Sequence, residues 1–177
     1  MAMIVLETPR LILRRLLPGD VDALHALYAD PEIRRHFPDG TLTRDQTREE
    51  IEWFLEGHPR HPDLGLWATI ERGSGEFLGR CGLLPWEIEG RHEVELAFLI
   101  DKRRWREGFA TEAANGIVDY ASRVLRLERL ICLIMPGNAA STGVARKIGM
   151  TFERTWTDAF GTCDVYARSL PRVPSET

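Results

Sequence analysis

The chain of 177 residues has the length of one ordinary domain, and its 44% hydrophobic and 28% charged residues are typical of globular proteins in water. A net charge of −4 argues against nonspecific nucleic-acid binding, which needs a basic face to neutralise phosphates. The N-terminus lacks the basic flank of a signal peptide, and no apolar run reaches the length of a membrane span. We therefore expect a cytoplasmic protein that has neither a membrane nor a nucleic acid as partner.

The N-terminal half is predicted to mix strands and helices. Pro18-Gly19-Asp20 ends a strand and caps a helix, Thr43-Arg44-Asp45-Gln46 has the spacing of a capping box, and Gly73-Ser74-Gly75 is typical of a hairpin turn. A loop is expected after Pro85. The predicted elements are strands over 8–16, 67–71, 77–84 and 93–101, and helices over 21–28, 31–36 and 44–56.

The stretch Arg103-Arg104-Trp105-Arg106-Glu107-Gly108-Phe109-Ala110 precedes a helix predicted over 111–125, whose apolar residues, Val124 included, recur every three or four positions. Unpaired N–H groups and the positive end of the helix dipole attract anions there, and Gly108 and Ala110 leave room for one. Neither the Rossmann nor the Walker spacing is present. The stretch is predicted to seat a phosphate. Lys102, Arg103, Arg104 and Arg106 either add charge to this seat or form a solvated basic cluster.

The C-terminal half contains an unbroken apolar run over 130–135, which predicts a strand buried on both faces. A right-handed crossover through the preceding helix would place it parallel to the strand over 93–101. A helix opening at Asn138 and ending at Gly149 follows, then a hairpin over 152–158 and 163–169. Residues 171–177 are expected to be a loose tail.

The three cysteines are an odd number and lie in apolar runs. Cys81, Cys132 and Cys163 are therefore expected to be reduced thiols in or near the core rather than disulfide, metal or nucleophilic groups. No Cys-x-x-Cys or His-Glu-x-x-His spacing occurs, so no metal site is expected.

Trp105, Gly108 and Ala110 stand at the defined positions of motif A of the GNAT acetyltransferase superfamily, and the segment from Asn138 to Met150 resembles its motif B. The chain resembles this family over nearly its whole length, and most closely the branch of the ribosomal-protein N-terminal (Rim-type) acetyltransferases. The resemblance implies an α/β fold with a mixed, mostly antiparallel sheet, a central splayed pair of parallel strands and flanking helices, in a single domain over residues 1–170. It also allows a homodimer.

The same resemblance implies acetyl-CoA as the acetyl donor, bound where the parallel strands splay. The backbone of Phe98, Leu99 and Ile100 would pair with the pantetheine, and backbone N–H groups would hold the pyrophosphate. Those N–H groups belong to Arg106, Glu107, Gly108, Phe109, Ala110 and Thr111. The Thr111 hydroxyl is either a further donor or an ordinary first-turn group.

Two positions near the reaction centre leave alternatives open, and two others depart from the pattern of the family. Asn138 either bonds the amides of the donor or caps the next helix, and Ser141 either protonates the leaving thiolate or bonds the local backbone. Many family members carry a tyrosine as this acid where the chain has Ala145, and Rim-type members usually have glycine where it has Arg106.

Glu93 and Glu95 are two residues apart on the predicted strand and so face the same side. Glu95 matches a glutamate of the family and is either the general base or a structural carboxylate. With Glu87 and Glu89, these side chains favour a cationic acceptor.

We expect an N-acetyltransferase in which a neutral amine attacks the thioester directly. An α-amine of pKa ~8 is about 10% neutral at pH 7, far more than a lysine of pKa ~10.4, so the expected acceptor is a protein or peptide N-terminus. The alternatives are a small-molecule amine, such as a polyamine, an antibiotic or an amino acid, and a non-catalytic acyl-CoA-binding module.

Overall fold

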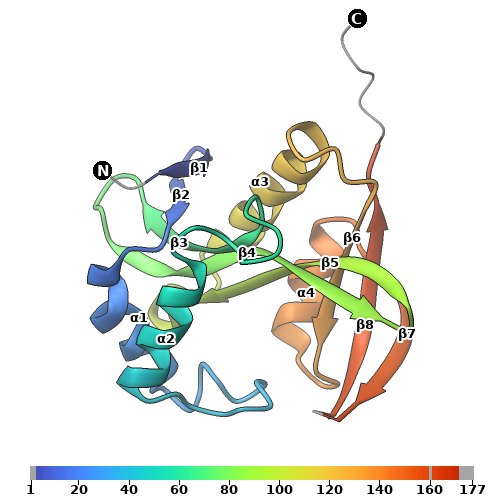
Figure 1. Ribbon diagram of the computed structural model, residues 1–177, viewed down its shortest axis with the longest axis horizontal. Coiled ribbons are helices and arrows are strands. Elements are labelled where there is room, and N and C mark those ends of the chain that lie inside the picture. Colours follow the sequence, from blue (N-terminus) through green and yellow to red (C-terminus); the bar gives the residue numbers. More distant parts are fainter. Residues whose placement is uncertain (1–2, 160, 172–177) are drawn as a thin grey trace, which may run out of the picture.

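The computed structural model describes residues 3–159 and 161–171. Within them, an eight-stranded sheet has the order β1-β2-β3-β4-β5-β6-β8-β7, in which only the β5–β6 pair is parallel (Figure 1). The strands are β1 (Ile4–Glu7), β2 (Leu11–Arg15), β3 (Gly65–Glu71), β4 (Phe77–Ile88), β5 (Arg91–Ile100), β6 (Arg129–Ile134), β7 (Thr151–Asp158) and β8 (Gly161–Ser169). The helices are α1 (Val21–Tyr28), α2 (Arg44–Phe54), α3 (Phe109–Arg123) and α4 (Ala139–Lys147), with short 3-10 turns η1 (Pro18–Asp20) and η2 (Lys102–Arg104). The predicted fold class is confirmed.

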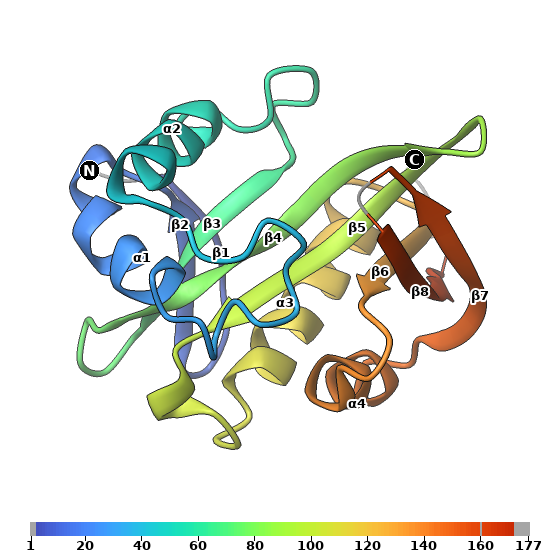
Figure 2. The same cartoon turned by 90° about the horizontal axis from the view of Figure 1, so that it is seen from below.

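Helices cover both faces of the sheet (Figure 2). Apolar residues of α3 and α4, such as Ile117 and Ala145, pack with one face in the largest core cluster. On the other face, Leu24 of α1 and Ile51 of α2 pack over β3 and the adjoining parts of β4 and β5. The apolar faces of the predicted amphipathic helices therefore pack against the sheet, as their periodicity predicts.

The parallel strands β5 and β6 separate soon after they meet. Their register contains one Cα pair, Glu95 with Ile131, whereas the β4–β5 hairpin is in register along its whole length from Gly79–Ile100 to Ile88–Arg91. Beyond Glu95, the edge of β5 thus has no continuous ladder with β6. The predicted splayed pair is confirmed.

Two predictions about local structure in the N-terminal half are wrong. Residues 31–36 form turns instead of a helix. The Asp30 carboxylate caps a single turn by accepting the N–H groups of Glu32 and Ile33, and its carbonyl accepts the Arg34 N–H, but no further helical bond follows before Phe37 bonds back to Arg34. Asp20 directly precedes α1 without a side-chain cap bond, since its carboxylate binds Arg14 and the Leu17 N–H.

The loop predicted after Pro85 is instead a continuation of β4. Strand β3 begins at Gly65, opposite Leu83, so beyond Leu83 no strand on that side would need the N–H group that Pro85 lacks. A tight turn at Glu89 and Gly90, both with positive φ, then reverses the chain into β5. The sheet is consequently longer at its centre than predicted.

The remaining outcomes concern the ends of elements and the cysteines. Strand β1 was not predicted, and Val124 is 62% exposed because α3 ends one residue before it. All three cysteines are free, and two of them are buried, as expected.

Of the predicted tail over 171–177, only Pro171 is among the residues described. None of the helices within residues 3–159 and 161–171 is long and apolar enough to cross a membrane.

Candidate active site

The N-terminus of α3 presents a run of unused backbone donors. Gly108 precedes the helix with a φ of 84°, and no side chain caps it. In the described part of the chain, no backbone or side-chain acceptor receives the N–H groups of residues 106–111. A helix N-terminus with six free donors fits a pyrophosphate, as the sequence predicts.

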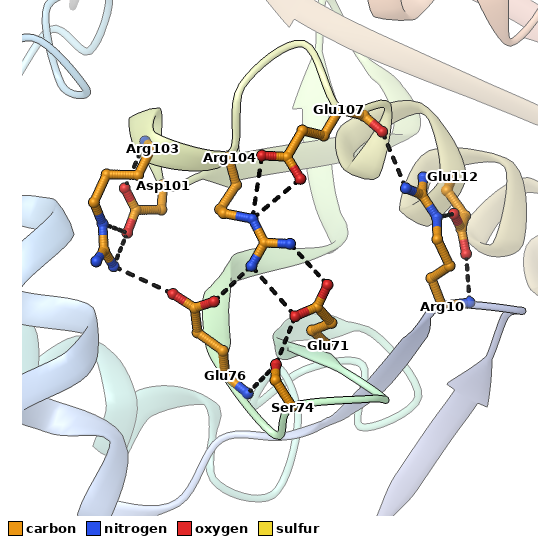
Figure 3. A network of polar contacts seen from close by, with 9 residues as sticks. All are labelled: Arg10, Glu71, Ser74, Glu76, Asp101, Arg103, Arg104, Glu107 and Glu112. Atoms are coloured by element: carbon orange, nitrogen blue, oxygen red, sulfur yellow. Dashed lines mark hydrogen bonds and ion pairs between the residues drawn. The ribbon is translucent and has the colours of Figure 1, made fainter.

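The basic residues in front of this helix are largely engaged within the protein (Figure 3). Arg104 binds Glu71 at 2.7 Å, Glu76 at 2.5 Å and Glu107 at 3.2 Å, and Arg103 binds Asp101 at 2.6 Å. Lys102 in turn binds Asp30 and Glu32. All three cations are engaged in ion pairs, although Arg103 and Lys102 remain partly exposed to solvent. They hold the loop before α3 against the β3–β4 turn.

Arg106 differs from its basic neighbours in two respects. It is exposed and forms no ion pair within the described ranges, so its guanidinium is free to face an anion at the helix N-terminus. Its φ is 67°, in the left-handed region that an L-residue adopts at a cost and glycine adopts freely. A glycine at this position would adopt the same backbone conformation without that cost.

Glu112 in the first turn of α3 ties the helix to the β1–β2 turn. Its carboxylate accepts the Thr8 hydroxyl at 2.6 Å and both the backbone N–H and the side-chain Nε of Arg10, at 2.8 and 2.6 Å. Burial alone would raise the pKa of Glu112, but these hydrogen bonds outweigh it and lower that pKa. Arg10 also bonds the Glu107 carbonyl, so both sides of Gly108 are fixed.

Along β5, the backbone N–H and C=O groups of successive residues point alternately towards β4 and towards β6. A Cβ atom placed on Gly79 of β4 would lie 2.0 Å from the Leu99 carbonyl oxygen, so Leu99 faces β4. Phe98 and Ile100 therefore direct their polar groups towards β6. The Ile100 carbonyl already accepts the Trp105 indole N–H at 2.8 Å. Of the three predicted pantetheine partners, the geometry favours Phe98.

At the start of α4, Asn138 acts as the N-cap, and its side-chain oxygen accepts the Ser141 backbone N–H at 3.1 Å. The amide nitrogen of Asn138 and the hydroxyl of Ser141 have no hydrogen-bond partner in the described chain. Capping thus leaves both groups available to a ligand. Ala145 is fully buried in the core one turn further on.

The two glutamates of β5 have different surroundings. Glu93 is 6% exposed and pairs with Arg129 at 3.0 Å, which makes it a structural carboxylate. Glu95 is half-buried and accepts the Trp86 indole N–H at 2.7 Å. Burial raises the pKa of Glu95, while this hydrogen bond and the charge of Arg80 oppose the rise. A carboxylate with a raised pKa at the splay is suited to accept a proton.

The carboxylates that were expected to attract a cationic acceptor are mostly paired. Glu87 lies 3.2 Å from His92, and Glu89 lies 3.4 Å from Arg154. Glu89 and Glu93 are thus held by arginines, and among the described residues Glu95 is the one of the four with neither an arginine nor a histidine within ion-pair distance. The electrostatic argument for a cationic acceptor is correspondingly weak.

Sequence reasoning missed Trp86, although a signal for it existed. The apolar residues Leu84, Trp86 and Ile88 alternate with Pro85, Glu87 and Glu89, which is a strand pattern that the proline concealed. The Arg10–Glu112 contact joins positions 102 residues apart and leaves no local signal.

A model of the acetyltransferase (GNAT) domain matches residues 10–151, which is most of the chain. The chain belongs to the GNAT acetyltransferase family. It is therefore a GNAT-type N-acetyltransferase, with acetyl-CoA as its acetyl donor. The uncharacterised protein YkkB of Bacillus subtilis is 34% identical over 151 residues, covering 85% of this chain and 87% of YkkB.

Solved structures share the fold of this acetyltransferase. An acetyltransferase from Agrobacterium tumefaciens has a TM-score of 0.78 and 26% identity, over 92% of each chain. RimL, a ribosomal L7/L12 alpha-N-protein acetyltransferase in complex with coenzyme A, has a TM-score of 0.77 over 94% of this chain and 98% of its own. At 18% identity, RimL demonstrates a common fold alone.

Proposed function

We propose that this acetyltransferase transfers the acetyl group of acetyl-CoA directly to the α-amine at the N-terminus of a protein or peptide, in one cytoplasmic domain over residues 1–170. The observation that carries the proposal is Glu95, a half-buried carboxylate with a raised pKa beside the point where β5 and β6 separate. Such a base can accept the proton of a weakly basic amine.

The residues of the donor site would act mainly through their backbone. The free N–H groups at the start of α3 would bind the pyrophosphate, Phe98 would pair with the pantetheine, and the Asn138 amide would bond one of its carbonyls. Acetyl-CoA supplies the activated acyl group as a thioester. The backbone N–H groups of Arg106, Glu107, Gly108, Phe109, Ala110 and Thr111 make up the proposed pyrophosphate contact.

Glu95 and Ser141 would divide the proton transfers between them. Glu95 takes a proton from the attacking amine, directly or through water, as the tetrahedral intermediate forms. A backbone N–H on the gap side of β5, that of Phe98 or Ile100, faces the developing oxyanion. The unpaired Ser141 hydroxyl donates its proton to the leaving thiolate, a role for which Ala145 has no group. The proton that Glu95 took from the amine then returns through water to Ser141, so that both groups regain their starting states.

Replacing Arg106 by glycine is expected to raise stability and lower the affinity for acetyl-CoA. The left-handed backbone costs an L-residue about 1–2 kcal/mol, and the chain entropy of glycine offsets part of this, so the free energy of unfolding should rise by up to about 1 kcal/mol. Loss of the unpaired cation should weaken binding of the pyrophosphate, most clearly at low salt. Thermal unfolding and calorimetric titration at two salt concentrations measure the two effects.

Arg106→Ala is the matched control for this prediction. It removes the charge but keeps an L-residue at positive φ, so affinity should fall without the gain in stability. If acetyl-CoA bound the glycine variant as tightly as the wild type at low salt, the guanidinium would not contact the donor.

The acceptor is tested by competition between amines. A peptide with a free N-terminus, the same peptide with a blocked N-terminus and one lysine, and a polyamine are mixed with the enzyme and acetyl-CoA, and the products are read by mass spectrometry. We expect acetylation of the free N-terminus to dominate, because its α-amine is more often neutral. Dominant acetylation of lysine would contradict the proposal, and dominant acetylation of the polyamine would select a small-molecule acceptor.

A further inference from the structure

Arg80 is a buried cation on β4 that the proposed reaction does not yet use. It is 5% exposed, and its Nε donates to the Tyr28 hydroxyl at 2.8 Å. Its two terminal nitrogens have no hydrogen bond or ion pair with any residue in the described ranges. The enclosed side-chain nitrogen and oxygen atoms that lack a partner in the described chain belong to His25, Thr69 and Arg154, so the terminal nitrogens of Arg80 still reach solvent. A guanidinium that is mostly buried yet keeps two accessible nitrogens without a protein partner can receive an acceptor group from outside the chain.

The surroundings of Arg80 hold it firmly in one orientation. The Tyr28 hydroxyl that receives its Nε in turn donates to Glu50 of α2, and Arg80 lies over the rings of Tyr28 and Phe37. Burial would lower the pKa of Arg80, but the Glu50 carboxylate and the hydrogen bond to the Tyr28 hydroxyl stabilise the charged form, and the pKa is raised. The guanidinium is therefore both fixed and always charged.

Arg80 shares a face of the sheet with Glu95. In the β4–β5 register, Arg80 pairs with Leu99, Gly82 with Ala97, and Leu84 with Glu95, and residues two apart on a strand face the same side. About 13 Å of strand separates the backbone positions of Leu99 and Glu95. The pKa of Glu95 is raised by burial, and the charge of Arg80 opposes part of this rise. The two groups therefore lie close enough to interact electrostatically.

The sheet surface between these two charged groups carries only small residues. Gly82 cannot be replaced by a larger residue, because a Cβ atom there would lie 2.0 Å from the Gly65 carbonyl oxygen, and Ala97 opposite it is half-exposed. On one side α1 and α2 cover the sheet, and on the other a separate cluster around Ile131 contains no residue of a described helix. A small acceptor could therefore lie between Arg80 and Glu95.

We propose that Arg80 binds a carboxylate of the acceptor, so that the preferred acceptor is an amine that carries an acidic group a few bonds away. The amine lies towards Glu95, and the carboxylate receives the free terminal N–H groups of Arg80 in the geometry that guanidinium and carboxylate share. The carboxylate is either the α-carboxylate of a free amino acid or the side chain of an acidic N-terminal residue. This inference rests on the proposed function, with Glu95 at the reacting amine.

Two matched pairs of acceptors test the inference and distinguish the two sources of the carboxylate. One pair is a free amino acid and its α-amide, and the other is a C-terminally amidated tripeptide that begins with Glu or with Gln. The wild type should prefer the acidic member of at least one pair by roughly 10- to 100-fold in kcat/KM, as expected for hydrogen bonds to a charged group. Arg80→Met should reduce this preference to below about 3-fold, and Arg80→Lys should retain part of it.

Arg34→Met is the matched control, because Arg34 lies over the same Tyr28 and Phe37 rings but is already bound to Asp39 and the Gly40 carbonyl. It should keep the acid preference of the wild type. Each preference is a ratio within one variant, so any loss of folded protein cancels.

Three results would overturn the inference, and one of them would also overturn the proposed acceptor class. A wild-type enzyme that acetylates amines without preferring the acid in either pair contradicts it and leaves the proposed function intact. A preference that survives in Arg80→Met places the carboxylate elsewhere. A wild type that acetylates none of these amines overturns the proposed acceptor class and this inference with it.

Discussion

Replacing Gly108 by valine is expected to reduce the affinity for acetyl-CoA by roughly 10- to 100-fold, the equivalent of the about 1–3 kcal/mol that overpacking a tight site costs. The new side chain would stand among the free N–H groups that are proposed to bind the pyrophosphate. The φ of 84° at this position also strains any L-residue, which would shift the donors themselves. Isothermal titration with acetyl-CoA measures the loss.

Gly90→Val is the matched control for strain. Gly90 has a φ of 76°, a Cβ atom added to it would have no atom within 4 Å, and it lies in the β4–β5 turn at the far end of β5 from α3. This variant should lose stability but bind acetyl-CoA normally. Unchanged affinity in folded Gly108→Val protein would place the phosphate elsewhere.

The fold could be predicted from the sequence wherever a local pattern determines the structure. The apolar run of β6, the three- and four-residue spacing in α3 and the capping box of α2 each determine their element locally, and α2 shows the predicted reciprocal bonds between Thr43 and Gln46. The predictions failed where the local structure depends on a part of the chain that is distant in the sequence. Pro85 is tolerated in β4 because β4 runs past the first residue of β3, and nothing near Pro85 in the sequence reveals where β3 begins.

The candidate site shows the same division between local and distant features. The prediction of a phosphate seat rests on glycine, small residues and a helix start, which are local features. The partners of Arg103 and Arg104 were not predictable, since Glu71 and Glu76 reach them from the β3–β4 turn. Arg80 carried a signal that was not used: a charged residue inside the apolar run over 77–84 indicates a buried charge with a specific purpose.

Changing Glu95 to glutamine is expected to lower turnover by ~10²–10⁴, with nearly unchanged affinity for acetyl-CoA. Glutamine can still accept the Trp86 indole N–H through its amide oxygen, so this contact is kept while proton acceptance is lost. Steady-state kinetics with the acceptor identified by competition, and titration with acetyl-CoA, measure the two quantities. Glu93→Gln is the matched control on the same face of β5: it breaks the pair with Arg129 and should cost stability more than turnover.

The pH dependence separates a catalytic from a structural Glu95. A base must be ionised, so wild-type kcat/KM should rise with pH through the raised pKa of Glu95, and this acidic limb should vanish in Glu95→Gln. The contribution of Glu95 to the stability of the folded state should instead fall as pH rises. A folded pKa above the unfolded one favours the folded state at low pH, and this contribution is lost as pH rises through the folded pKa. At pH 7 the glutamine variant should therefore be at least as stable as the wild type, whereas a structural carboxylate would make it less stable and leave the acidic limb in place.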